Sequence, residues 1–181
     1  MTDKEKALYP FPRREWNDPS FTVLRSWWQG LESDKGDRAE LRRATSLTAV
    51  MLNPAFHRLL RKLRQAGYGI SDSRYPKLAV IAGLAARVKG ETDANLATCM
   101  GTPRSAGSKA VVSELRMRRM LACDDLEELY TLLRRALALL DNHANLADLS
   151  ATIWQWVPMD EKRPNDPRRQ LAYDYYAAAP L

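Results

Sequence analysis

Residues 112–140 read VSELRMRRMLACDDLEELYTLLRRALALL, and this stretch joins the densest positive charge in the chain to its clearest helical pattern. After Cys123, apolar residues recur at steps of three and four positions, which puts them on one face of an α-helix. The members of this stripe are Leu126, Leu129, Tyr130, Leu133, Leu137 and Leu140. Asp124 or Asp125 is expected to cap the start, because a short acidic side chain there can accept a backbone N–H. The stretch therefore predicts a long helix with one face in a core.

The same helical wheel places the two arginines of this helix. Arg135 follows Leu133 by two positions, which is about 200° of rotation at 3.6 residues per turn. We therefore expect Arg135 to face solvent and Arg134 to lie on the flank of the apolar stripe.

Further helices are predicted along the whole chain. Start signals stand at Asp18-Pro19, Asp37, Asn53-Pro54, Asn145 and Asp166-Pro167, and stop signals at Gly36 and Gly67. Residues 75–90 are apolar around most of the helix circumference, which is typical of a central buried helix, and a shorter helix is expected at 93–100. No segment alternates like a strand. The sequence predicts an all-α fold, a helical bundle of two packed lobes.

The lobe boundary is expected where glycine, serine and proline gather, in residues 101–109. We predict an N-terminal lobe at 18–100 and a C-terminal lobe at 110–181, although the same chain could form one compact domain. Residues 1–17 are interrupted by proline and basic, and should form an extended arm.

The composition favours an anionic partner. The 181 residues carry 28 Lys and Arg against 22 Asp and Glu, a formal net charge of +6. No apolar run is long enough to span a bilayer and residues 1–6 are too polar for a secretory signal, so a cytoplasmic protein without membrane contact is expected. The two cysteines, Cys99 and Cys123, lack the CxxC spacing of a zinc site and suggest no disulfide framework.

Catalytic groups are few. His57 lies beside an apolar stripe and His143 in a loop, and two histidines so far apart match no zinc spacing. Four acidic residues, Asp124, Asp125, Glu127 and Glu128, could resemble a metal site, but helix-start charge explains them more simply. We expect no catalytic site, no metal and no cofactor.

Arginine-rich groups recur on separate predicted helices. As candidate nucleic-acid-binding residues we select Arg42, Arg43, Arg61, Arg116, Arg118, Arg119, Arg134, Arg135, Lys162, Arg163, Arg168 and Arg169. The planar guanidinium group suits phosphates and protein carboxylates equally well. About half of these residues are therefore expected to be solvated or to form internal ion pairs. Trp27, Trp28, Trp154 and Trp156 stand beside leucines at helical spacing and should be core residues, not base-stacking ones.

The order of these motifs resembles the CasB family, the small subunit of the type I-E CRISPR surveillance complex Cascade. The resemblance covers nearly the whole chain from Phe21 onward. It is carried by residues 26–32 (SWWQGLE), 36–44 (GDRAELRRA), 54–59 (PAFHRL), 113–121 (SELRMRRML), 125–137, 154–156 (WQW) and 168–176 (RRQLAYDYY).

The resemblance implies a non-catalytic, all-α subunit. It further implies that the chain pairs with a second copy of itself beside the backbone and large subunits of Cascade, which carry the guide RNA. A basic surface would hold the displaced non-target DNA strand and support the guide–target hybrid. Two other functions remain open: a helical DNA-binding transcriptional regulator, and a scaffold whose arginines contact acidic proteins.

Overall fold

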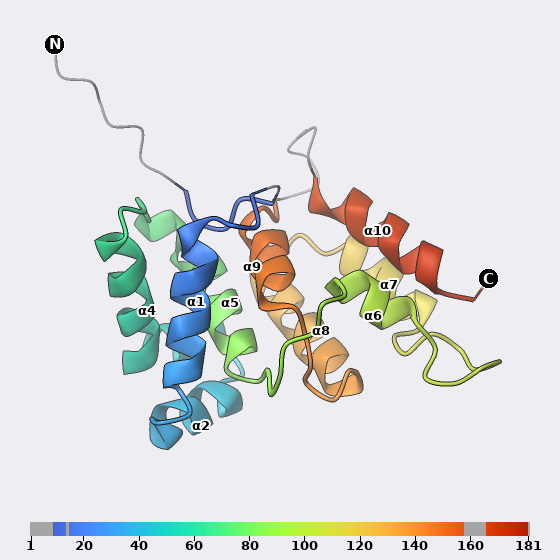
Figure 1. Ribbon diagram of the computed structural model, residues 1–181, viewed down its shortest axis with the longest axis horizontal. Coiled ribbons are helices and arrows are strands. Elements are labelled where there is room, and N and C mark those ends of the chain that lie inside the picture. Colours follow the sequence, from blue (N-terminus) through green and yellow to red (C-terminus); the bar gives the residue numbers. More distant parts are fainter. Residues whose placement is uncertain (1–8, 14, 158–165, 181) are drawn as a thin grey trace, which may run out of the picture.

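The computed structural model describes residues 9–13, 15–157 and 166–180, and within these ranges it is built from α-helices with no β-strand. The all-α prediction is confirmed (Figure 1). The helices are α1 (Pro19–Gly30), α2 (Lys35–Arg43), α3 (Leu47–Met51), α4 (Pro54–Gln65), α5 (Tyr75–Ala85), α6 (Leu96–Gly101), α7 (Glu114–Leu121), α8 (Leu126–Leu139), α9 (Leu146–Trp154) and α10 (Pro167–Ala178), with a 3-10 turn, η1 (Asp72–Arg74), before α5.

Most helix starts lie where the capping signals predict them. The side chains of Asp18, Asn53, Asp125, Asn145 and Asp166 each accept a backbone N–H from the first turn of the helix that follows. Each cap satisfies a donor that would otherwise have no partner within the helix, which fixes where the helix begins.

The start of α2 was predicted wrongly. Gly36 does not stop a helix, because α1 ends at Gly30 and α2 begins at Lys35, with Asp34 as its cap. Asp37, the predicted cap, lies in the first turn and donates its N–H to the Asp34 side chain. A glycine inside an exposed helix costs only about 1 kcal/mol relative to alanine, so a good cap upstream outweighs it.

Helix α5 is the centre of the fold. All residues from Leu78 to Ala85 are buried, as predicted, although the helix ends at Ala85 and not near Gly90. It packs against α2, α3, α4, α8 and α9. The Tyr130 ring of α8 crosses α5 at Gly83, and its hydroxyl donates to the carbonyl of Ala44 at 3.0 Å. Tyr130 thereby ties α8 to the chain just after α2.

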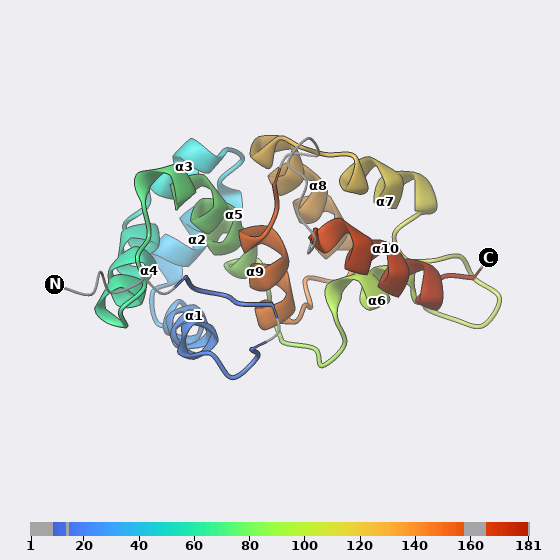
Figure 2. The ribbon, with the colours of Figure 1, turned by 90° about the horizontal axis from the view of Figure 1, so that it is seen from above.

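The molecule is elongated. Figure 1 shows α1, α2 and α4 at one end and α6, α7 and α10 at the other, with α5, α8 and α9 between them. Figure 2 shows α3, α8 and α7 along one long edge and α1 along the other. One continuous cluster of buried apolar residues runs through both ends. Helix α6, which precedes the 101–109 loop, packs against α10, which follows it. The division into lobes at this loop stays a prediction.

Part of the predicted N-terminal arm belongs to the core. Phe11 is fully buried, and its ring centroid lies 5.8 Å from those of both Phe21 and Trp154. Its backbone N–H donates to the Ser20 hydroxyl at 2.8 Å. Phe11 has a φ of 60°, which is uncommon for a bulky residue and is held here by burial and this hydrogen bond.

Candidate nucleic-acid interface

Three arginines from three parts of the chain converge beside Tyr130, and we call Arg42, Arg87 and Arg134 the basic cluster. Arg42 lies in the last turn of α2, Arg87 just beyond α5 and Arg134 on α8. The Arg87 guanidinium donates to the backbone carbonyl of Arg42. Burial lowers the pKa of Arg87, and the positive charges of Arg134 and Arg42 lower it further. The charge of Arg87 is therefore close enough to those of Arg42 and Arg134 to be repelled by both.

The aromatic ring of Tyr130 packs against the guanidinium group of Arg134. Tyr130 precedes Arg134 by four residues, one helical turn, and the Arg134 guanidinium carbon lies 5.3 Å from the Tyr130 ring centroid. A guanidinium over an aromatic face at this distance is held by a cation–π interaction. Burial raises the pKa of the Tyr130 hydroxyl, so the ring stays neutral under the arginines.

Within the part of the chain that the structure describes, the positive charge of the cluster has no counterion. Among the described residues, none of its arginines forms an ion pair with a carboxylate, and the Nε atoms of Arg87 and Arg134 lack hydrogen-bond acceptors. By contrast, Arg25, Arg58 and Arg104 all pair with acids. The exposed Arg43 and Arg135 follow Arg42 and Arg134 in the chain and extend the positive surface. A bound anion would relieve the repulsion.

The helical-wheel predictions for α8 are confirmed, since Arg135 is exposed and Arg134 half-buried. Arg119 of α7 reaches α8 and pairs with Glu128 at 2.8 Å. Glu128 and Arg135 are seven residues apart, so they lie on nearly the same side of α8, about 10 Å apart along its axis. Arg119, although it belongs to α7, thus lies beside the same side of α8 as Arg135.

The remaining predicted residues do not join this surface as one group. Arg116 and Arg118 are exposed on α7, and Arg61 is exposed on α4. Helices α4 and α7 lie at opposite ends of the molecule (Figure 1). Arg169 is exposed on α10, and Lys162 and Arg163 lie outside the described residues.

Arg168 requires a correction, because it is buried and its guanidinium is fully used inside the protein. It donates to the carbonyls of Leu121, Cys123 and Val157 at 2.7 to 3.0 Å and pairs with Asp124 at 2.9 Å. Its guanidinium carbon lies 4.3 Å from the Trp156 ring centroid. Arg168 joins the ends of α7 and α9 to α10 and cannot reach a nucleic acid.

The prediction for the tryptophans is confirmed. Trp27, Trp154 and Trp156 are buried, Trp28 is half-buried, and the indole N–H groups of Trp27, Trp28 and Trp156 donate to backbone carbonyls. These rings are packed, so they offer no free face to a base.

Arg87 was not predicted as a site residue, although the sequence contains a signal for it. It is the single charged residue in the apolar run from Leu78 to Val88. A charge at the end of a fully buried helix must either find a partner or emerge at the surface, which makes such a residue a candidate for function.

No group of histidine, cysteine, aspartate and glutamate side chains among the described residues could hold a metal ion. Within the same ranges, none of the helices has the length and apolar character needed to cross a membrane.

A family model described as CRISPR-associated protein Cse2 matches residues 37–176, or 140 of the 181 residues. The chain belongs to the Cse2 family. Cse2 is the CasB protein of type I-E CRISPR systems, so the resemblance is confirmed, and the family is a small subunit of the RNA-containing Cascade complex. No curated protein matches the chain. The basic cluster and α8 lie inside the Cse2 match, whereas α1 and Phe11 precede it.

Proposed function

We propose that this chain is a non-catalytic subunit of Cascade that uses the basic cluster, with Arg43 and Arg135, to hold the displaced non-target DNA strand. Arg119, which pairs with Glu128, would join them by exchanging that carboxylate for a phosphate. The observation that carries the proposal is the convergence of Arg42, Arg87 and Arg134 without a carboxylate among the described residues to neutralise them. Phosphates are the anions that such a surface suits best.

The energetics of target opening support a role for a few modest contacts. Exchanging a DNA duplex for an RNA–DNA hybrid is nearly balanced, so backbone contacts of a few kcal/mol can tip it. Contacts to phosphates carry no sequence information. The guide RNA would then read the target sequence, and this chain would slow the return of the displaced strand.

If the chain is a subunit of Cascade, its binding partners are the other subunits of that complex. The chain would lie against the subunits that carry the guide RNA, the backbone and large subunits, beside a second copy of itself. Single-stranded DNA tracks along positively charged surfaces of this kind. The arginines on and beside α8 would offer the strand successive phosphate contacts.

The test uses the reconstituted complex with Arg42, Arg43 and Arg135 replaced by alanine. These side chains are exposed, so the fold should persist. The lifetime of the opened target should shorten, and a nuclease should reach the displaced strand more readily. A matched control replaces Arg61, Lys62 and Lys109, which are exposed elsewhere and carry the same total charge.

An unchanged lifetime in the first variant, or an equal loss in both, would refute the proposal. A strong preference of the isolated chain for one duplex sequence would instead indicate a transcriptional regulator. Failure of the first variant to enter the complex, with DNA binding intact, would indicate that the arginines contact acidic protein surfaces.

A further inference from the structure

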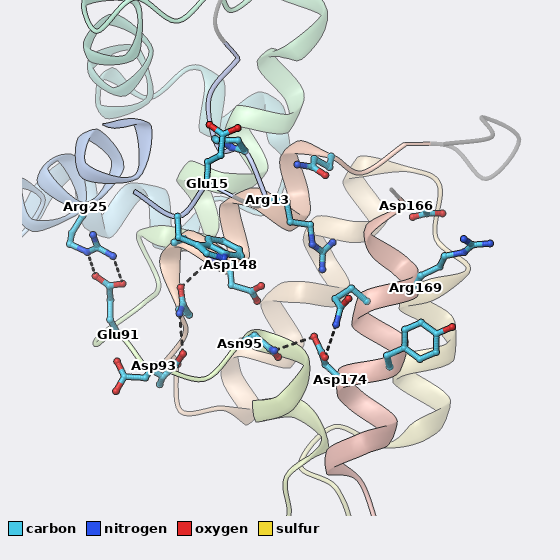
Figure 3. Close-up of a pocket in the computed structure, with 18 residues that line it drawn as sticks. Arg13, Glu15, Arg25, Glu91, Asp93, Asn95, Asp148, Asp166, Arg169 and Asp174 are labelled. Atoms are coloured by element: carbon cyan, nitrogen blue, oxygen red, sulfur yellow. Dashed lines mark hydrogen bonds and ion pairs between the residues drawn. The ribbon is translucent and has the colours of Figure 1, made fainter. Parts of the chain in front are cut away.

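A large open groove lies between α10 on one side and α1 with the N-terminal segment on the other, and its floor includes the start of α9 (Figure 3). Its volume is about 1220 Å³, more than the roughly 300–1,000 Å³ of small-molecule pockets. Its size and open form suit a segment of polypeptide better than a metabolite. We call it the α1–α10 groove.

The charge of this groove is opposite to that of the chain. Six carboxylates line it, and they are Glu15, Glu91, Asp93, Asp148, Asp166 and Asp174. They face three arginines, Arg13, Arg25 and Arg169. The groove therefore has an excess of negative charge within a protein of net charge +6. A nucleic acid would be repelled here, whereas a basic partner would be attracted.

Four of the six carboxylates already have internal roles. Glu91 pairs with Arg25, and Asp174 accepts from the side chain of Asn95 at 3.1 Å (Figure 3). Asp148 accepts the Leu96 N–H at 2.8 Å. Asp166 caps α10.

The other two carboxylates are available to a partner. The Glu15 and Asp93 side chains are exposed and form no hydrogen bond or ion pair with the described part of the chain. They are the acids that an incoming lysine or arginine could pair with.

Exposed aromatic rings lie among the groove's lining residues. Trp16 is 52% exposed and Tyr173 is 72% exposed, so neither belongs to the core. Tryptophan and tyrosine are among the residues that are enriched at protein–protein interfaces. Their rings can also stack on a lysine or arginine side chain through cation–π contacts.

We infer that the α1–α10 groove binds an extended, basic segment of another protein subunit. A lysine or arginine of that segment would pair with Asp93 or Glu15 and lie against Trp16 or Tyr173. The inference rests on the proposed function only in placing the chain within a multi-subunit complex. Figure 2 shows α1 on the long edge opposite α8, so protein and nucleic acid would be held on different sides of the molecule.

The test is Asp93→Lys, with Asp72→Lys as the matched control. Asp72 is an exposed acid on η1, outside the groove. Each variant is titrated into the complex purified without this subunit. We expect the Kd of Asp93→Lys for this complex to rise by about tenfold or more, because it places like charges together. Asp72→Lys should bind as the unaltered chain does. Equal binding by the two variants would overturn the inference.

A second measurement identifies the occupant directly. A photo-crosslinking phenylalanine derivative replaces Tyr173, whose exposed ring needs no partner for folding, and the assembled complex is irradiated and digested. The expected product joins residue 173 to a lysine- or arginine-rich peptide of a protein subunit. A crosslink to RNA or DNA, or none to protein, would refute the groove's assignment. If the unaltered chain does not bind the complex at all, the proposed function itself fails.

Discussion

The Tyr130 ring of α8 packs against Gly83 of α5 so closely that a Cβ atom at Gly83 would lie 2.6 Å from the Tyr130 hydroxyl oxygen. Only glycine leaves room for this crossing. The same hydroxyl donates to Ala44, and the same ring lies under Arg134. The absence of one side chain on the central helix therefore sets the position of the basic cluster.

Replacing Gly83 with alanine should destabilise the protein by about 1–3 kcal/mol, because the overpacked ring must move. Gly36 is the control, since it lies in α2 with nothing within 4 Å of the added Cβ. Gly36→Ala should stabilise by about 0.5–1 kcal/mol through helix propensity. Urea unfolding of both variants measures the difference. A stable Gly83→Ala protein would contradict the packing described for Tyr130.

Replacing Arg168 with alanine should cost about 3 kcal/mol or more, because three buried carbonyls and Asp124 lose their donor. Arg169→Ala, one residue further along α10, should change stability by less than about 0.5 kcal/mol, since that side chain is exposed. Thermal unfolding of the two variants compares a buried with a surface arginine. Similar losses in both would show that the guanidinium of Arg168 contributes little.

Binding of the isolated chain to single-stranded DNA should be weak, independent of sequence and sensitive to salt. Each phosphate contact contributes about 0.7 to the slope of log affinity against log salt concentration for a single strand. Arg42→Ala and Arg135→Ala should each lower the slope by about that amount. Fluorescence anisotropy at several salt concentrations measures it. A slope that falls equally with Arg61→Ala would mean that binding is spread over the whole surface.

The two cysteines should differ in reactivity. Burial raises the pKa of the Cys123 thiol to about 11, and the nearby Glu128 carboxylate adds to the effect. At pH 8 this thiol is almost entirely protonated, and the thiolate is the reactive form. Iodoacetamide should therefore label the partly exposed Cys99 and leave Cys123 unlabelled, as read by peptide mass spectrometry. Rapid labelling of Cys123 in the folded protein would contradict its burial.

The raised pKa of Cys123 also makes the stability of the folded protein depend on pH. The ordinary thiol value is 9.0, below the folded value of about 11. As the pH rises through this interval the unfolded thiol loses its proton first, so the folded state loses stability. Replacing Cys123 with alanine should remove this part of the pH dependence.

The sequence predicts those structural features that depend only on residues close together in the chain. Asp125 and Asn145 cap helices by bonds to residues three positions away, and the exposure of Arg135 follows from its angle on one helix. These features need no knowledge of the tertiary fold. The same holds for the buried helix α5, whose apolar circumference is a local property.

The candidate site depends on contacts between distant segments, and sequence patterns identify such contacts less well. Arg168 and Arg169 are identical neighbours, yet one turns inward onto carbonyls 11 to 47 residues away and the other faces solvent. Arg87 meets Arg42 and Arg134 only because α2 and α8 both pack on α5. No periodicity in the sequence encodes either outcome.

The burial of Phe11 in the core affects where a protein of this family can be truncated. The Cse2 match begins at residue 37, but Phe11, Phe21, Leu24 and Trp27 all lie in the core before it. A protein trimmed to the matched region would lose α1 and expose the partners of these side chains, including Trp154. Removing a single buried phenylalanine costs about 3–5 kcal/mol, a large share of a typical domain's 5–15 kcal/mol. The region that the family model matches is thus smaller than the unit that folds, and expression should begin ahead of Phe11.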